Sequence, residues 1–197
     1  MADYKTAKDF IKEQTGIITA KDFKNQGISF FLIKKLIEDY MIERVDKGIY
    51  IKTDEFEDTY YIFQSKISKA VFSYNTALYL LGKTEVIPER IDITIPSDYN
   101  AQRIDKSYTI HYVSKDFLTL GITEATTLFG NKVICYNLER TICDLVKNKN
   151  NGLDSEQVNK IIRNAFLYKQ IDIALLYEYA KKLRCVKKIE MLTEVLL

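Results

Sequence analysis

Two short helices are predicted at the start of the chain, and apolar residues at helical spacing indicate the first. One face of the first helix is formed by Tyr4, Ala7, Phe10 and Ile11. Gly16 ends this helix. Thr19, followed three residues later by Asp22, forms a capping box that starts a second helix, which ends at Gly27.

A third helix is predicted from its N-cap residue Ser29 to about Tyr40. At about 100° per residue, apolar side chains gather on one side, with Phe30 at the edge of that side. This inner side holds Ile33, Leu36, Ile37 and Tyr40. The outer side holds Phe31, Lys34, Lys35 and Glu38. We therefore expect Phe31 to be exposed beside two lysines, although it is apolar.

The residues that follow predict a β-hairpin. Strand-like segments run from Ile42 to Val45 and from Ile49 to Ile51, and the turn between them contains Gly48, which tolerates a positive φ. Two helices joined by a tight turn form a helix-turn-helix, and a hairpin directly after it is a wing. We expect a winged helix-turn-helix domain at residues 1–53.

The rest of the chain mixes strand and helix patterns. Strands are expected at 91–95 and 106–113, and a hairpin at 122–137 turns at Gly130–Asn131. Helices are expected over 66–82, with a break at Ser73, over 138–149, and as three helices from 154 to the end. Strands grouped between helices indicate an α+β domain with a mostly helical C-terminal part.

The distribution of charge suggests where the two domains meet. Residues 54–62, DEFEDTYYI, carry four acids and no base, whereas the segments before and after them carry net charges of +2 and +4. A run of like charges is typical of a solvated segment. We expect an acidic linker at 54–62 and an α+β domain at 63–197.

Composition excludes several classes of function. The longest apolar runs are far shorter than the roughly 20 residues of a membrane span, and the first residues lack the apolar core of a secretory signal, so we expect a cytoplasmic protein. One histidine and three scattered cysteines cannot supply a structural zinc site or a catalytic triad. Cys135, Cys143 and Cys185 are expected to be buried as small apolar residues.

The predicted DNA-reading surface combines the third helix with flanking cations and hydroxyls. The N-terminal residues of such a helix reach base edges in the major groove, and apolar groups can contact a thymine methyl. Phosphates are contacted by Lys and Arg side chains and by backbone N–H groups at a helix start. The candidate contact residues are Thr19, Lys21, Lys24, Ser29, Phe31, Lys34, Lys35, Arg44 and Lys47.

A second basic run lies near the C-terminus. It has no acid among its eight residues, KKLRCVKK, and it is either a solvated helix surface or a patch for an anionic partner such as nucleic acid. Its bases are Lys181, Lys182, Arg184, Lys187 and Lys188.

The polar residues of the larger domain do not assemble into a convincing catalytic motif. Asp92 lacks the second acid that a metal pair needs, because Thr94 occupies that position. Arg140 and Asp144, four residues apart, are interpreted as a structural ion pair. His111 lies inside a strand pattern and is interpreted as a sheet residue rather than a metal ligand. We therefore expect no enzymatic activity, cofactor or metal.

Five segments in their order resemble the AbiEi-type antitoxins of bacterial abortive-infection toxin–antitoxin systems. They are GIITAKDFKNQGIS, RVDKGIYIK, SYNTALYLLG, RIDITIP and YNLERTICDL, which together span about residues 15 to 145. The end of the wing, KGIY, together with the ERTICDL helix in one chain is a fairly specific combination.

The resemblance implies an autorepressor that binds inverted repeats in the promoter of its own operon, with Ser29–Tyr40 as the reading helix and Ile42–Ile51 as the wing. It also implies a phage-defence role as functional antagonist of a nucleotidyltransferase-like toxin, without need of a stable complex. Two alternatives stay open from the residues alone. One is a nucleic-acid-modifying enzyme targeted by a winged helix, and the other is a ligand-sensing transcription factor without a toxin partner.

Overall fold

The computed structural model of the chain describes residues 2–102, 104–148 and 155–196. They form an α+β structure with two compact units. The first unit runs to Lys66 and also includes residues 128–131, and the second holds residues 67–127 and the chain after residue 131. Within the described ranges, no helix is both long and apolar enough to cross a lipid bilayer.

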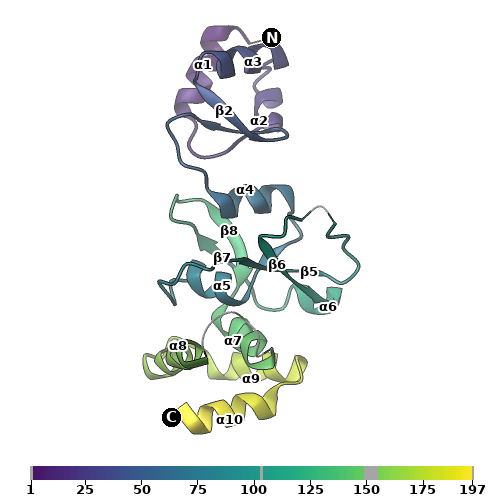
Figure 1. Ribbon diagram of the computed structural model, residues 1–197, viewed down its shortest axis with the longest axis vertical. Coiled ribbons are helices and arrows are strands. Elements are labelled where there is room, and N and C mark those ends of the chain that lie inside the picture. The colour runs from purple at the N-terminus through teal and green to yellow at the C-terminus, as the bar shows by residue number, and fades with distance from the viewer. Residues whose placement is uncertain (1, 103, 149–154, 197) are drawn as a thin grey trace. The chain divides into compact units, whose positions relative to one another are not determined.

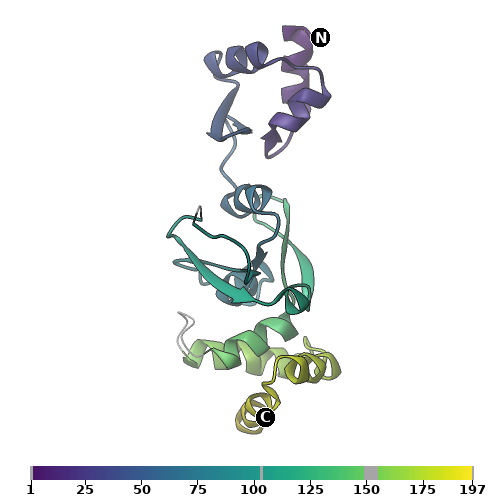
Figure 2. The same ribbon diagram turned by 90° about the vertical axis from the view of Figure 1, so that its right-hand side faces the viewer.

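The first unit packs helices against a small antiparallel sheet (Figures 1 and 2). Its sheet has the order β1-β3-β2. Its elements are α1 (Tyr4–Glu13), β1 (Ile18–Thr19), α2 (Ala20–Asn25), α3 (Phe30–Glu38), β2 (Ile42–Asp46), β3 (Ile49–Lys52) and α4 (Thr59–Lys66).

The core of this unit lies where α1, α2 and α3 meet the sheet. Phe23 of α2 is fully buried, and its ring meets the rings of Phe10 and Tyr50 edge to face at 5.9 and 5.3 Å between centroids. Such edge-to-face pairs add about 0.5–1.5 kcal/mol each to the free energy of burial. The buried residues shared by these elements are Ala7, Ile11, Ile18, Phe23, Ile28, Ile33, Leu36, Ile42 and Tyr50.

The acidic stretch at 54–62 differs from the solvated linker expected there. Asp58 is only 3% exposed, and its side chain accepts a hydrogen bond from the backbone N–H of Tyr61 at 3.1 Å, at the start of α4. Glu55 accepts from the N–H of Gly16 at 2.8 Å and pairs with Lys52 at 3.0 Å. Carboxylates readily satisfy backbone donors at helix starts and turns, so part of this stretch is ordered within the first unit.

The second unit is built on a five-stranded mixed sheet with the order β6-β5-β4-β8-β7. The β5/β6 and β4/β8 pairs are parallel, and the β4/β5 and β7/β8 pairs are antiparallel. Its strands are β4 (Val71–Phe72), β5 (Ile91–Pro96), β6 (Tyr108–Val113), β7 (Ile122–Thr126) and β8 (Lys132–Tyr136). Its helices are α5 (Tyr74–Leu80), α6 (Lys115–Leu118), α7 (Leu138–Lys147), α8 (Ser155–Leu167), α9 (Ile173–Lys182) and α10 (Val186–Leu196).

Helices α7 to α10 gather around a second apolar core (Figure 2). Three C-terminal helices were predicted, and α8, α9 and α10 confirm that prediction. The prediction of a helix just before Ser73 is wrong, because β4 lies there at the centre of the sheet. A strand of two residues carries no periodicity by which sequence could reveal it.

One buried arginine holds the ERTICDL segment of α7 in place. Arg140 is 2% exposed, and its Nε donates to Asp144 Oδ2 at 2.9 Å, which confirms the predicted ion pair. Its Nη1 donates to the carbonyl oxygens of Phe117 and Leu120 at 2.8 and 2.9 Å. The guanidinium carbon lies 4.3 Å from the ring centroid of Tyr136. This side chain therefore fixes α7 to the segment that precedes β7.

Candidate nucleic-acid interface

The start of α3 presents two aromatic rings to solvent. Ser29 caps the helix, with its Oγ accepting from the N–H of Leu32 at 3.4 Å. Ile33 and Leu36 are buried, which fixes the opposite side outward. Phe31 is 74% exposed, as the helical wheel predicts. Phe30, which was placed at the edge of the apolar side, is 67% exposed in the first turn and lies outside the buried core.

The two lysines of α3 differ in their surroundings. Both are exposed, but Lys35 Nζ lies 4.3 Å above the ring centroid of Tyr4 in a cation–π contact. The Tyr4 hydroxyl donates a hydrogen bond to Asp39, which raises the pKa of Tyr4 to about 12. Lys34 forms no ion pair with any described residue. It is therefore the cation of α3 most available to an external anion.

Helix α2 contributes exposed cations but not a free hydroxyl. Thr19 Oγ1 accepts from the N–H of Asp22 at 3.3 Å and donates to the Asp22 carboxylate at 2.6 Å. The same carboxylate accepts from the N–H of Thr19 at 2.8 Å, so the predicted capping box is present. The Thr19 side chain is occupied by capping, whereas Lys21 and Lys24 are exposed.

The β2–β3 hairpin carries bases on both sides of an acid. The Nε of Arg44 donates to the carbonyl oxygen of Asp46 at 3.1 Å, and Gly48 has the predicted positive φ of 75°. Asp46 pairs with Lys66, whose hydrogen bond lowers the pKa of the Asp46 carboxyl. Lys47, at the tip, is exposed. The negative charge of Asp46 thus has a partner within the unit, and Lys47 extends outward.

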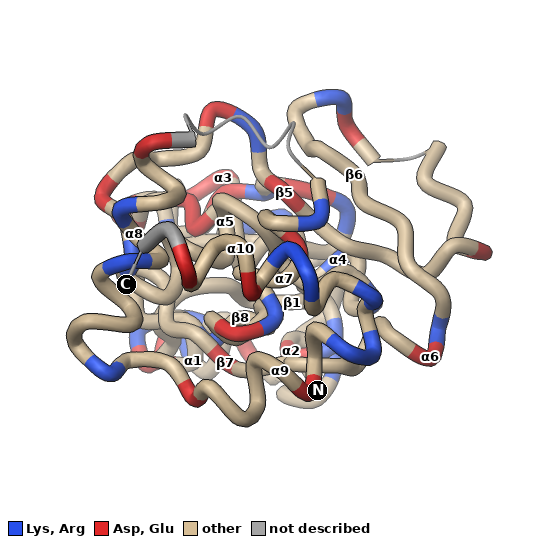
Figure 3. Tube along the Cα trace, turned by 90° about the horizontal axis from the view of Figure 1, so that it is seen from below, with Lys and Arg blue, Asp and Glu red and all other residues tan. Residues whose placement is uncertain are grey.

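The C-terminal basic run is divided by the fold. Helix α9 ends at Lys182, Arg184 adopts a left-handed φ of 58°, and α10 begins at Val186. Lys182 pairs with Glu178 at 2.7 Å, and Lys188 donates to the carbonyl oxygen of Lys147 at 3.1 Å. Figure 3 shows basic and acidic positions interspersed along the trace. Within this run, the exposed cations that have no such contact with a described residue are Lys181, Arg184 and Lys187.

Of the polar residues considered as catalytic candidates, Asp92, Arg140 and Asp144 are buried in the second unit, and His111 is half-buried. His111 Nε2 lies 2.8 Å from Asp92 Oδ1, and the His111 ring stacks on Tyr74 with 3.8 Å between centroids. Burial is the main cause that raises the pKa of Tyr74 to about 12. His111 thus has a partner within the sheet, as predicted. No group of three or more acids, histidines and cysteines suited to a metal occurs among the residues described. All three cysteines are buried, as predicted.

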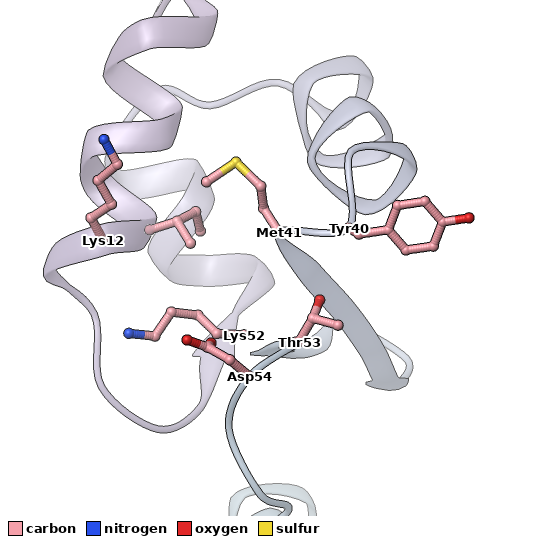
Figure 4. Close-up of a pocket in the computed structure, with 7 residues that line it drawn as sticks. Lys12, Tyr40, Met41, Lys52, Thr53 and Asp54 are labelled. Atoms are coloured by element: carbon pink, nitrogen blue, oxygen red, sulfur yellow. The ribbon is translucent and has the colours of Figure 1, made fainter.

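An open pocket of about 580 Å³ lies at the other end of α3 (Figure 4). Met41 and Lys12 border it, and Tyr40 points away from Met41 in that view. Tyr40, which was expected on the buried side of α3, is 83% exposed with a φ of 54°, because it follows the last turn of the helix. The nine residues of α3 span about 13 Å, so this pocket is separate from the Phe30–Phe31 surface.

Comparisons with known proteins leave the family of this chain open. No protein-family model matches the chain, and no curated protein matches it. Among solved structures, the crystal structure of the RV2827C protein from Mycobacterium tuberculosis aligns over 92% of this chain and 74% of that one. The sequence identity is 12% and the TM-score is 0.46. A likeness at this level transfers no function, so any functional proposal depends on the residues of the chain itself.

Proposed function

We propose that this chain is a DNA-binding antitoxin that represses its own toxin–antitoxin operon. The observation that carries the proposal is the start of α3, where Phe31 and Lys34 face solvent while Ile33 and Leu36 are buried. The order α1-β1-α2-α3-β2-β3 fits a winged helix, with α3 as the reading helix and β2–β3 as the wing.

The proposed interface combines base contacts with phosphate contacts. The first turn of α3 would enter the major groove, where side chains at the N-terminal end of a helix reach base edges. Lys21 and Lys24 of α2 and Arg44 and Lys47 of the wing would contact phosphates on either side. One such unit carries little net charge, so we expect two copies to occupy the two halves of an inverted repeat.

The antitoxin part of the proposal rests on the resemblance of five sequence segments to AbiEi-type antitoxins. In that role the chain acts in the cytoplasm against a nucleotidyltransferase-like toxin encoded beside it, without enzymatic activity or cofactor. We assign the antagonism to the second unit, because the first is accounted for by DNA binding. The exposed cations at the α9–α10 corner, Lys181, Arg184 and Lys187, would supply secondary contacts to nucleic acid.

Removing both lysines of α3 is expected to abolish specific DNA binding. In a gel shift with the promoter fragment, Lys34→Ala combined with Lys35→Ala should weaken affinity about 100-fold or more. Lys34→Ala alone should lose more than Lys35→Ala alone, because Lys35 is already engaged with Tyr4. The matched control for each single variant is Lys12→Ala, which removes one charge from an exposed position of α1 and should bind like the natural chain. Unchanged affinity of the double variant, with a native circular dichroism spectrum, would falsify the proposed role of α3.

Toxin neutralisation is expected to survive the loss of DNA binding. Co-expression of the full chain with the adjacent nucleotidyltransferase-like toxin should restore growth of the host cells. The Lys34→Ala, Lys35→Ala chain, expressed from a foreign promoter, should restore growth equally well, because its second unit is unaltered. Colony counts at matched protein levels provide the measurement. Failure of the natural chain to restore growth would refute the antitoxin role and leave a DNA-binding regulator.

A further inference from the structure

Two adjacent phenylalanines form an apolar surface on the first turn of α3. The exposed fractions of Phe30 and Phe31 are 67% and 74%, so both rings remain largely in water. Consecutive residues of a helix point about 100° apart, so the two rings flank one surface patch rather than form a continuous apolar one. Exposed apolar area that large marks a candidate interaction site. This patch lies on the helix that we propose as the reading helix, and the inference rests on that proposed function.

The polar groups around this patch are mostly engaged within the unit. The Ser29 hydroxyl caps the helix through the N–H of Leu32, and the Lys35 ammonium lies over the Tyr4 ring. Lys34 is one turn further along, and on a helical wheel it falls between the two rings, about 40° from Phe30 and 60° from Phe31. The surface offered by the first half of α3 is therefore two aromatic rings around one ammonium group.

The chemistry of this surface matches one feature of the major groove better than the others. Guanine and adenine are read through hydrogen-bonding side chains, whereas thymine presents an apolar C5-methyl group. The phenylalanine rings have no hydrogen-bonding group, and Lys34 can meet a flanking phosphate. We propose that Phe30 and Phe31 read thymine methyl groups, so that the operator has thymines at the steps contacted by the start of α3.

Replacing thymine by uracil in the DNA tests this proposal without knowledge of the operator sequence. A promoter fragment amplified with dUTP in place of dTTP keeps every Watson–Crick pair and lacks only the methyl groups. The natural chain should bind the uracil fragment about ten-fold more weakly than the thymine fragment. The Phe30→Ala, Phe31→Ala variant should bind the thymine fragment more weakly than the natural chain and should not distinguish the two fragments.

Phe56 provides a matched control for the loss of an exposed ring. It is 83% exposed in the same unit but lies outside α3, so Phe56→Ala should keep the full preference for thymine. Equal binding of both fragments by the natural chain would overturn methyl reading while leaving DNA binding in place. Absence of promoter binding to either fragment would instead refute the proposed function itself. If the double variant binds as the natural chain does and only its oligomeric mass changes, the rings contact protein rather than DNA.

Discussion

Replacing Arg140 by leucine is expected to destabilise the second unit by about 3–5 kcal/mol, because the change leaves a buried acid without its partner. Asp144 is 7% exposed and would lose the guanidinium 2.9 Å away. The carbonyl oxygens of Phe117 and Leu120 would lose their donors as well. Urea unfolding followed by far-ultraviolet circular dichroism measures the loss, since the chain contains no tryptophan.

The effect of Arg140→Leu should increase with pH. Burial raises the pKa of Asp144 above its ordinary 3.8, against the pull of Arg140 in the opposite direction. The folded chain therefore keeps this proton to higher pH than the unfolded chain. The stability that the proton contributes is fully present below about pH 3.8 and is lost as the pH rises through the raised pKa of Asp144. Without Arg140 the pKa of Asp144 rises further, so the penalty should be larger at about pH 7 than at about pH 4.5.

A second substitution separates the lost pairing from the lost packing. Arg140→Leu combined with Asp144→Leu removes both charges and should recover much of the stability that the single change loses. If the double variant is no more stable than Arg140→Leu alone, the arginine contributes through its carbonyl contacts and packing on Tyr136 rather than through the ion pair.

Introducing a methyl group at Gly121 is expected to destabilise the same region by about 3–4 kcal/mol. Gly121 has a φ of 79°, and a Cβ added there would lie 2.5 Å from the Cβ of Arg140 and 3.0 Å from Oδ1 of Asn137. Asn137 Oδ1 also caps α7 by accepting from the N–H of Arg140 at 3.0 Å. Gly121→Ala therefore combines a strained backbone with a clash against the start of a buried helix.

Gly82 separates the two contributions. It has a φ of 65° in the same unit, but a Cβ added there meets no atom within 4 Å. Gly82→Ala should lose only the backbone contribution, about 1–2 kcal/mol. Thermal unfolding of both variants gives the comparison. Equal losses would mean that α7 shifts to accommodate the new methyl group and that the close approach at Gly121 is not required for stability.

Local patterns in the sequence predicted local structure well. The Thr19–Asp22 capping box, the turn at Gly48 and the Arg140–Asp144 pair each depend on residues no more than four positions apart. The local geometry of the helix or turn therefore brings the interacting residues of each feature together. The exposure of Phe31 follows from the same helical geometry, because the neighbouring apolar residues determine which side is buried.

The features that sequence did not predict depend on distant partners. Asp58 was assigned to a solvated linker, yet it is buried at the start of α4 because a backbone donor satisfies its carboxylate. Glu139 of α7 accepts from the backbone N–H of Asp172 at 2.9 Å, a contact across 33 residues that no spacing rule could reveal. In the proposed interface, Lys35 contacts Tyr4 only because α1 packs beside α3, and the spacing of residues along the chain does not reveal that packing.

The central position of β4 has a consequence for how the second unit folds. Phe72 pairs with Ile93 of β5 on one side and with Cys135 of β8 on the other. The two residues of β4 therefore join the two halves of the sheet. The β7/β8 hairpin can form early because its strands are neighbours in the chain, whereas β4 must close long loops to reach β8. We therefore expect Phe72 to belong to the rate-limiting nucleus, where truncation of its ring would slow refolding more than it speeds unfolding.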